Sequence, residues 1–246
     1  MRNPRWRKVV RDLWGNKVRT ALVVMSIAVG VFAVGMVAGT QEILTRDMQA
    51  TYLAIDPPAV ILGLDRFDDD LVATIRRMPQ IDDAEGRASI SVRLLVGPET
   101  WRTLQIQAIP DFRDIRVNKI APQQGDWPPP SHSMLVERSS LFLTNARIGD
   151  SVTIELPDGK RRSIRIAGTA HNTNMPPASF TGWVDGFVTF ETIEWLGVPH
   201  AYSSLFLTVN DKTLDRDGVS RIANEVRDKI EAGGRHISFA YIPIPG

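Results

Sequence analysis

Three consecutive aspartates, Asp68, Asp69 and Asp70, are the first candidates for chemistry in this sequence. Carboxylates grouped in this way can bind a divalent cation. The same residues begin the segment DDDLVATIRRMP, in which apolar residues recur at helical spacing. An aspartate at the start of a helix accepts hydrogen bonds from free backbone N–H groups and offsets the helix dipole. Helix capping therefore explains these residues better than a metal site.

The other reactive residue types are scattered. The serine pairs 139–140 and 203–204 lack the glycine pattern of a nucleophile elbow. The chain contains no cysteine, no GxGxxG and no P-loop motif. No HExxH or HxH spacing relates the four histidines, which are His132, His171, His200 and His236. We therefore expect that the protein is not an enzyme and has no cofactor and no metal site. Of the three functions considered in this subsection, a secreted enzyme has the least support.

Two loop segments could bind a ligand. Residues 158–162, Asp-Gly-Lys-Arg-Arg, have a composition suited to phosphate, although a hairpin turn with solvated charges explains them better. Residues 172–183, NTNMPPASFTGW, form a long polar loop with aromatic residues at one end. This loop could contact a ligand or a partner, and a plain surface loop is the simpler interpretation.

The overall charge gives no reason to expect nucleic-acid binding. The 246 residues include 29 Lys+Arg and 28 Asp+Glu, for a net charge of +1. Basic residues nevertheless crowd the first twenty positions, where Asp12 is the single acidic residue. An excess of positive charge is therefore concentrated at the N-terminal end, directly before a long apolar segment.

Residues 21–39 carry no charge and predict a transmembrane helix. At ~1.5 Å per residue the segment is roughly 28 Å long, close to the ~30 Å hydrocarbon core of a bilayer. The basic flank lies on its N-terminal side, so the positive-inside rule predicts a cytoplasmic N-terminus. The chain is then a single-pass protein of the cytoplasmic membrane, with residues 40–246 extracytoplasmic.

A cleaved signal peptide is the alternative, because residues 37–39, Val-Ala-Gly, would be a tolerable cleavage site. The apolar segment is longer than the usual signal core of ~7–15 residues. Residues 1–20 also have the pattern of a cytoplasmic amphipathic helix lying in the membrane interface. Apolar and charged residues occupy opposite faces, and the predicted interface residues are Trp6, Trp14, Arg5, Lys8 and Arg11.

Small residues mark two faces of the predicted transmembrane helix. Ser26, Gly30 and Ala33 follow one face, and a nearly opposite face carries Ala28, Gly35 and Gly39. Small side chains allow another helix to approach closely. The alternative is that glycine and alanine are common in membrane helices in any case. No second apolar segment follows, so a packing partner would be another molecule or a part of the protein outside this sequence.

The extracytoplasmic region is predicted to be α+β, with a β-rich insertion. Residues 40–58 continue the helical pattern as a stalk, and residues 59–115 and 201–246 each combine strands with a capped helix. We expect their strands to share one sheet with the helices on one face. Between them, residues 116–200 contain a clear hairpin around Asp158-Gly159 and further strands, which indicates a small inserted subdomain.

Two motifs resemble MacB/FtsX-like ABC transporter permeases. LWGNKVRTALVVMSIAVGVFAVG (13–35) resembles their N-terminal segment, where an Asn-Lys-x-Arg-Thr cluster enters the first span. SMLVERSSLFLTNARIGDSVTIELPDGKRRSIRIAG (133–168) resembles their extracytoplasmic core, where an acidic residue precedes a short helix and a hairpin follows. The resemblance covers nearly the whole chain and implies a porter-like α+β part split by the β-rich insertion.

The resemblance implies a permease that transmits movement. A separate ATPase subunit would hydrolyse ATP and move the spans, and the stalk would move the outer domain. Members of the family continue into three further spans and a cytoplasmic loop that docks the ATPase, so this chain resembles the N-terminal part of such a permease. The implied partners are the membrane, the ATPase subunit through segments not in this chain, and a second permease in a homodimer or heterodimer. The alternative is a single-pass membrane-anchored binding protein without an ATPase.

Overall fold

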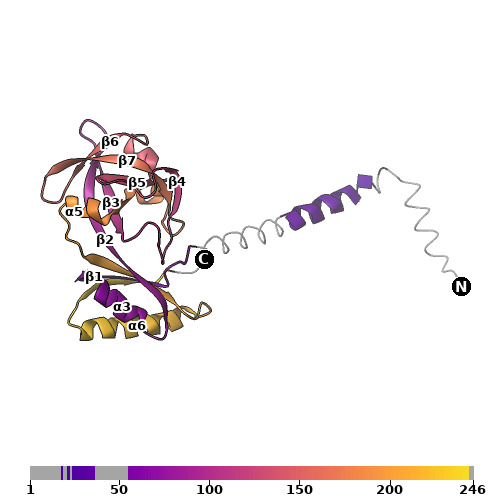
Figure 1. Cartoon of the computed structure of the whole chain (residues 1–246). Helices are drawn as coiled ribbons and strands as arrows, with labels where there is room; N and C mark the ends of the chain where they lie inside the picture. Colours follow the sequence, from indigo (N-terminus) through magenta and orange to yellow (C-terminus); the bar gives the residue numbers. More distant parts are fainter. Residues whose placement is uncertain (1–17, 19–20, 23, 37–54, 244–246) are drawn as a thin grey trace. The chain divides into compact units, whose positions relative to one another are not determined.

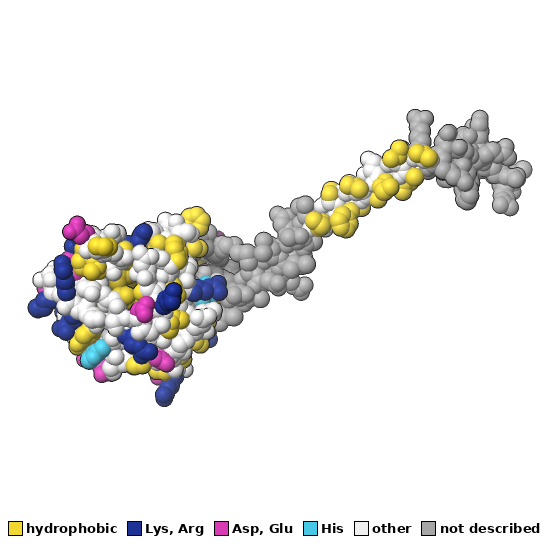
Figure 2. Space-filling view, turned by 90° about the horizontal axis from the view of Figure 1, so that it is seen from above, with side chains coloured by type: hydrophobic (Ala, Val, Ile, Leu, Met, Phe, Trp, Pro, Cys, Tyr) yellow, Lys and Arg dark blue, Asp and Glu magenta, His cyan; other side chains and the backbone are white. Residues whose placement is uncertain are grey.

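The computed structural model describes residues 18, 21–22, 24–36 and 55–243, and the chain divides into two units, residues 1–51 and 52–246 (Figure 1). In the first unit, residues 24–36 form a helix whose side chains are all exposed. Figure 2 shows apolar side chains along the visible face of this helix. Within the described residues, no helix is both long enough and apolar enough to cross a membrane. Most of the predicted segments 1–20 and 40–58 lies outside the described residues.

The second unit contains a four-stranded antiparallel sheet with two helices. The strands lie in the order β10 (Ile237–Tyr241), β1 (Val60–Phe67), β9 (Tyr202–Val209) and the first half of β2 (Ile81–Leu95). Helix α3 (Asp69–Arg76) connects β1 to β2, and α6 (Arg216–Ala232) connects β9 to β10. This β-α-β-β-α-β order is that of a ferredoxin-like fold. The two ends of the region therefore share one sheet, as the sequence predicted.

Both helices begin after an aspartate, and the sequence indicated the first of the two. Asp68 accepts a hydrogen bond from the backbone N–H of Leu71, and Asp215 accepts one from Gly218 at 2.8 Å. The inward faces of both helices are apolar, and four buried residues of α6 pack into the main core. The aspartate cluster 68–70 is thus the N-terminal turn of α3, as the capping interpretation predicted.

The remaining strands form a closed ring. From the second half of β2 the pairing runs through β3 (Trp101–Ile109), β8 (Val184–Thr189), β5 (Ser133–Glu137), β7 (Arg161–His171) and β6 (Ser151–Glu155), and β6 pairs with β2 again. This closure makes a six-stranded barrel, to which β4 (Ala121–Gly125) adds an edge through β7. The short helices η1 (Leu141–Thr144) and α4 (Ala178–Thr181) connect its strands, and α5 (Phe190–Trp195) connects β8 to β9 of the four-stranded sheet.

The barrel also includes strands from outside the predicted insertion. The hairpin of residues 88–109 lies in the predicted part 59–115, but its strands pair with β6 and β8 of the barrel. The reason is that β2 is fifteen residues long and passes from the sheet into the barrel without a break. The barrel is therefore inserted where a ferredoxin-like fold has its central hairpin. The division at residues 116 and 200 stays a prediction.

Candidate functional site

The predicted site residues on the membrane segment are only partly described. Trp6, Trp14, Arg5, Lys8, Arg11 and Gly39 lie outside the described residues. The other five small residues lie in the exposed helix 24–36, and they are Ser26, Gly30, Ala33, Ala28 and Gly35. A Cβ added at Gly30 or Gly35 would meet nothing within 4 Å. Their role in helix packing therefore stays a prediction.

The described residues contain another candidate site, at the point where β2 leaves the sheet for the barrel. Glu85 and Arg87 lie two residues apart on β2, so both side chains point to the same face of the strand. Both are buried, with 6% and 0% of their surface exposed. Burying two charges costs several kcal/mol per ion unless they are paired and hydrogen-bonded. A chain that keeps them here needs close partners for each.

Arg87 meets that requirement with hydrogen bonds from all three guanidinium nitrogens. Its Nε donates to Glu85 at 2.8 Å, Nη1 donates to the side chain of Gln107 at 2.9 Å, and Nη2 donates to the carbonyl oxygens of Val117 and Asn118 at 2.6 and 3.1 Å. The guanidinium also lies over the ring of Phe206, 4.7 Å from its centroid. Burial lowers the pKa of Arg87, and the charge and hydrogen bond of Glu85 oppose this shift.

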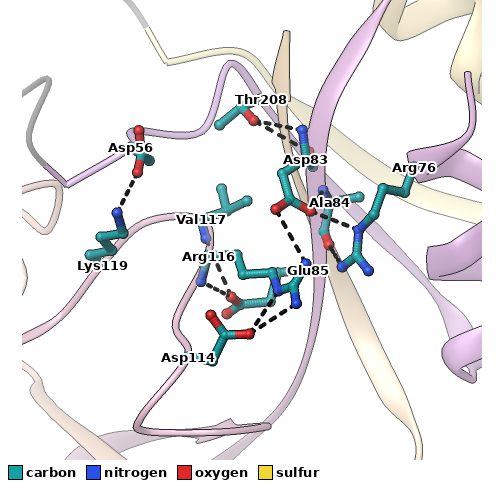
Figure 3. A network of polar contacts seen from close by, with 10 residues as sticks. All are labelled: Asp56, Arg76, Asp83, Ala84, Glu85, Asp114, Arg116, Val117, Lys119 and Thr208. Atoms are coloured by element: carbon teal, nitrogen blue, oxygen red, sulfur yellow. Dashed lines mark hydrogen bonds and ion pairs between the residues drawn. The ribbon is translucent and has the colours of Figure 1, made fainter. Parts of the chain in front are cut away.

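Glu85 fixes the segment that connects β3 to β4. Its second carboxylate oxygen accepts the backbone N–H groups of Arg116 at 2.7 Å and Val117 at 3.3 Å (Figure 3). Arg87 holds the same segment from the carbonyl side, at Val117 and Asn118. The ion pair thus satisfies buried backbone groups of residues 116–118 and locks this linker onto β2.

The same linker also holds the chain where it enters the domain. Asn118 and Lys119 donate backbone N–H groups to the carbonyl oxygens of Asp56 and Ile55, at 2.8 and 2.7 Å. The side chain of Lys119 reaches Asp56 at 2.6 Å (Figure 3). Lys212 lies 3.7 Å from the same carboxylate. Residues 55 and 56 are therefore joined through the linker to Glu85 and Arg87.

Further ion pairs connect helix α3 to this junction. Arg76 of α3 bonds Asp83 at 2.7 Å and donates to the carbonyl oxygen of Ala84. Arg116 lies 3.8 Å from Asp83 and bonds Asp114, and Thr208 of β9 bonds the backbone of Asp83 (Figure 3). These contacts are more exposed than the Glu85–Arg87 pair, so each stabilises the fold less. Together they surround β2 at the point where it changes sheets.

We call residues 55–56, 85–87 and 116–119 the junction. Every charged group in it is paired or hydrogen-bonded with another group of the chain. This site was not predicted from the sequence. The available signal was a glutamate and an arginine at i and i+2 next to a strand, but the surrounding stretch IDDAEGR is polar enough to hide the strand itself.

A second polar cluster lies at one end of β5. The buried carboxylate of Glu137 accepts hydrogen bonds from the backbone and hydroxyl of Ser139 and lies 3.0 Å from Nδ1 of His171. Burial, followed by the charge of Glu137, raises the pKa of Asp185 to about 6. Because the hydroxyl of Ser139 donates to Glu137 rather than to His171, the arrangement differs from a nucleophile and base.

Two other histidines, His132 and His200, lie outside this cluster. His132 stacks on Trp195 at 4.4 Å between ring centroids, and His200 bonds Glu194. Among the described residues, no group of three or more His, Asp or Glu side chains could hold a metal ion. The loop 172–183 contains α4 and exposes Phe180 and Trp183.

No protein-family model and no curated protein matches the sequence. Among solved structures, the chain is similar to the periplasmic region of MacB from Actinobacillus actinomycetemcomitans, with 10% identity, a TM-score of 0.45, and coverage of 74% of this chain and 87% of that one. It is also similar to the extracellular domain of the noncanonic ABC-type transporter YknZ from Gram-positive bacteria, with 11% identity, a TM-score of 0.45, and coverage of 73% and 100%. Both are regions that lie outside the cytoplasm, the periplasmic region of one protein and the extracellular domain of the other.

Proposed function

We propose that this chain is the permease component, or the N-terminal part of it, of an ABC transporter of the MacB/FtsX type. Residues 21–39 cross the cytoplasmic membrane with the N-terminus inside, and the rest of the chain lies outside the cytoplasm. A separate ATPase subunit, bound through segments not in this chain, hydrolyses ATP. The resulting movement of the membrane segment displaces the extracytoplasmic domain, which acts on a substrate or an outer partner.

The observation that supports this proposal most directly is the junction. A chain that only anchors a binding protein needs no particular attachment where it enters the domain. Here residues 55 and 56 are bonded to residues 118 and 119, and the adjoining residues 116–118 are bonded to the buried pair Glu85–Arg87. Because β2 belongs to both the sheet and the barrel, a displacement at residue 55 reaches both parts of the domain through hydrogen-bonded backbone.

The apolar helix supports the membrane part of the proposal. Residues 24–36 carry eight exposed large hydrophobic side chains, each with 60% or more of its surface exposed, and they are Val24, Met25, Ile27, Val29, Val31, Phe32, Val34 and Met36. Such a surface is stable in lipid or against another apolar surface, not in water. With the basic flank before it, the helix is oriented with its N-terminus in the cytoplasm.

The proposal predicts both a topology and a partner. Reporter fusions at residue 2 should be active in the cytoplasm, and fusions at Gly246 should be active outside it. The protein to which this chain belongs, with every segment that it has in the cell and a small affinity tag, is isolated in mild detergent. It should bring with it an ATP-hydrolysing subunit whose activity vanadate inhibits. A Gly246 fusion active only in the cytoplasm contradicts the topology. A correctly oriented chain that carries no ATPase would favour the membrane-anchored binding protein.

The small-residue face predicts where another membrane helix packs. In lipid, helix association depends on close packing, so a bulky side chain on the face of Ser26, Gly30 and Ala33 should push a partner away. We expect Gly30→Leu or Ala33→Leu to reduce co-purification of two differently tagged copies, or of the ATPase. Val34→Leu and Met36→Leu are the matched controls, because at ~3.6 residues per turn they lie to the side of that face. Equal yields for all four variants would show that the small residues reflect only composition.

A further inference from the structure

Strand β10 is a free edge of the sheet. It pairs with β1 through residues 237 and 239–241, and among the described residues no other strand pairs with it. Residues 238–241 are exposed, including Phe239 with 52% and Tyr241 with 55% of their surface. An edge strand presents a row of unpaired backbone N–H and C=O groups, which is a template for another strand.

The two aromatic residues of β10 lie on one face of the sheet, because they are two residues apart. Phe239 pairs with Gly63 of β1, and Tyr241 pairs with Ile61. A Cβ at Gly63 would lie only 2.0 Å from the ring of Phe239, so the ring lies directly over the backbone of β1. The edge therefore has an exposed apolar surface as well as free backbone groups.

The other end of the strand order is β4, on the barrel, and it is protected against a further strand. Strand β4 contains Pro122 and ends at Gly125 with a φ of 87°. Proline removes a backbone donor, and an irregular edge discourages a further strand. Strand β10, with the sequence ISFAY, contains no proline, no glycine and no charged residue. A protein normally avoids such an edge unless something pairs with it.

We propose that β10 pairs antiparallel with β10 of a second copy of this chain, with Phe239 at the two-fold axis. In this register Phe239 lies opposite Phe239 of the other copy, Ile237 opposite Tyr241, and Ser238 opposite Ala240. Cross-strand pairs of aromatic and β-branched residues stabilise a sheet. No like charges oppose each other, because Arg235 lies opposite Pro243. The two four-stranded sheets then become one sheet of twice that size, with the isologous interface that two-fold symmetry requires.

The absence of cysteine from the chain allows a direct test. Ser238→Cys and Ala240→Cys chains are expressed together at full length, and isolated membranes are oxidised. In the proposed register these two positions face each other within the Cα separation of a disulfide, about 4.4–6.8 Å. We expect a disulfide-linked dimer from the mixture, several-fold more abundant than from either variant alone, because like positions are then displaced along the strands by two residues.

The control is Asn224→Cys, on an exposed position of α6. A mixed yield no higher than that of this control overturns the proposal, and so does a yield as high from Ser238→Cys or Ala240→Cys alone. A strand from a different protein on this edge would also give no dimer of two copies. The proposal stands apart from the transporter function, because the co-purification of an ATPase is measured on the unmodified chain and does not depend on this edge.

Discussion

Replacing Arg87 with methionine is expected to destabilise the extracytoplasmic domain by about 3–5 kcal/mol, the loss typical when one partner of a buried ion pair is removed. Arg87 is fully buried, and its removal leaves Glu85 charged without its ion-pair partner and the carbonyl oxygens of Val117 and Asn118 without donors. The measurement is chemical or thermal unfolding of the full-length chain in detergent. Backbone amides of Arg116 and Val117 should also exchange with solvent faster.

Two further variants make this result specific to the junction. Arg221→Met removes the same charge from an exposed position of α6 and should change the free energy of unfolding by no more than about 0.5 kcal/mol. The double variant Glu85→Leu/Arg87→Met should be more stable than Arg87→Met alone, because no unpaired charge is buried. It should remain less stable than the unmodified chain, since the N–H groups of residues 116 and 117 lose their acceptor. An Arg87→Met chain as stable as Arg221→Met would contradict the assigned role of the pair.

Measuring transport distinguishes a mechanical role of the junction from a contribution to stability alone. If the junction transmits displacement from residue 55, loosening the linker should impair transport even at temperatures where the domain stays folded. The contact of Lys119 with Asp56 offers a mild way to do this, because it is partly exposed and its loss costs little stability. A Lys119→Met chain that is folded but less active would support the mechanical role.

The sequence predicted the local structure well, because the signals for it are local. The caps of α3 and α6, the apolar spacing of α6 and the hairpin β6–β7 each depend on residues within one or two turns of each other.

The barrel could not be predicted in this way, because its closure depends on pairs distant in sequence. Strand β3 pairs in parallel with β8, which brings Leu104 opposite Val184, and β6 closes the ring by pairing Ile154 with Leu94. The alternation of apolar residues predicts each strand, but it does not predict which strands pair with each other. The junction could not be predicted for the same reason. Glu85 and Arg87 have the sequence pattern of surface charges, and they are buried only because the linker 116–118, some thirty residues later, covers them.

Gly86, the single glycine of β2, lies between the two charged residues of the junction and should not tolerate a larger residue. Its side of the strand faces Tyr202, and a Cβ added there would lie 2.5 Å from the ring. That ring is fixed by a hydrogen bond to Asp69 at 2.8 Å and by packing against Phe67 and Phe190, each 5.5 Å away between centroids. Gly86→Ala must therefore displace either β2 or the ring, and we expect a loss of about 1–3 kcal/mol in the free energy of unfolding.

Gly97→Ala is the matched control, because it makes the same chemical change in the turn between β2 and β3. A Cβ there would have ordinary contacts, the nearest being Thr100 at 3.5 Å, and the backbone of Gly97 is not in the left-handed region. Where alanine fits without strain, it stabilises a protein by about 0.4–1 kcal/mol through the unfolded state. The two substitutions should thus shift the unfolding midpoint in opposite directions. A shift of the same sign and size would mean that β2 can move away from Tyr202 at little cost, and a strand that moves so easily could not pass a displacement from residue 55 to the barrel.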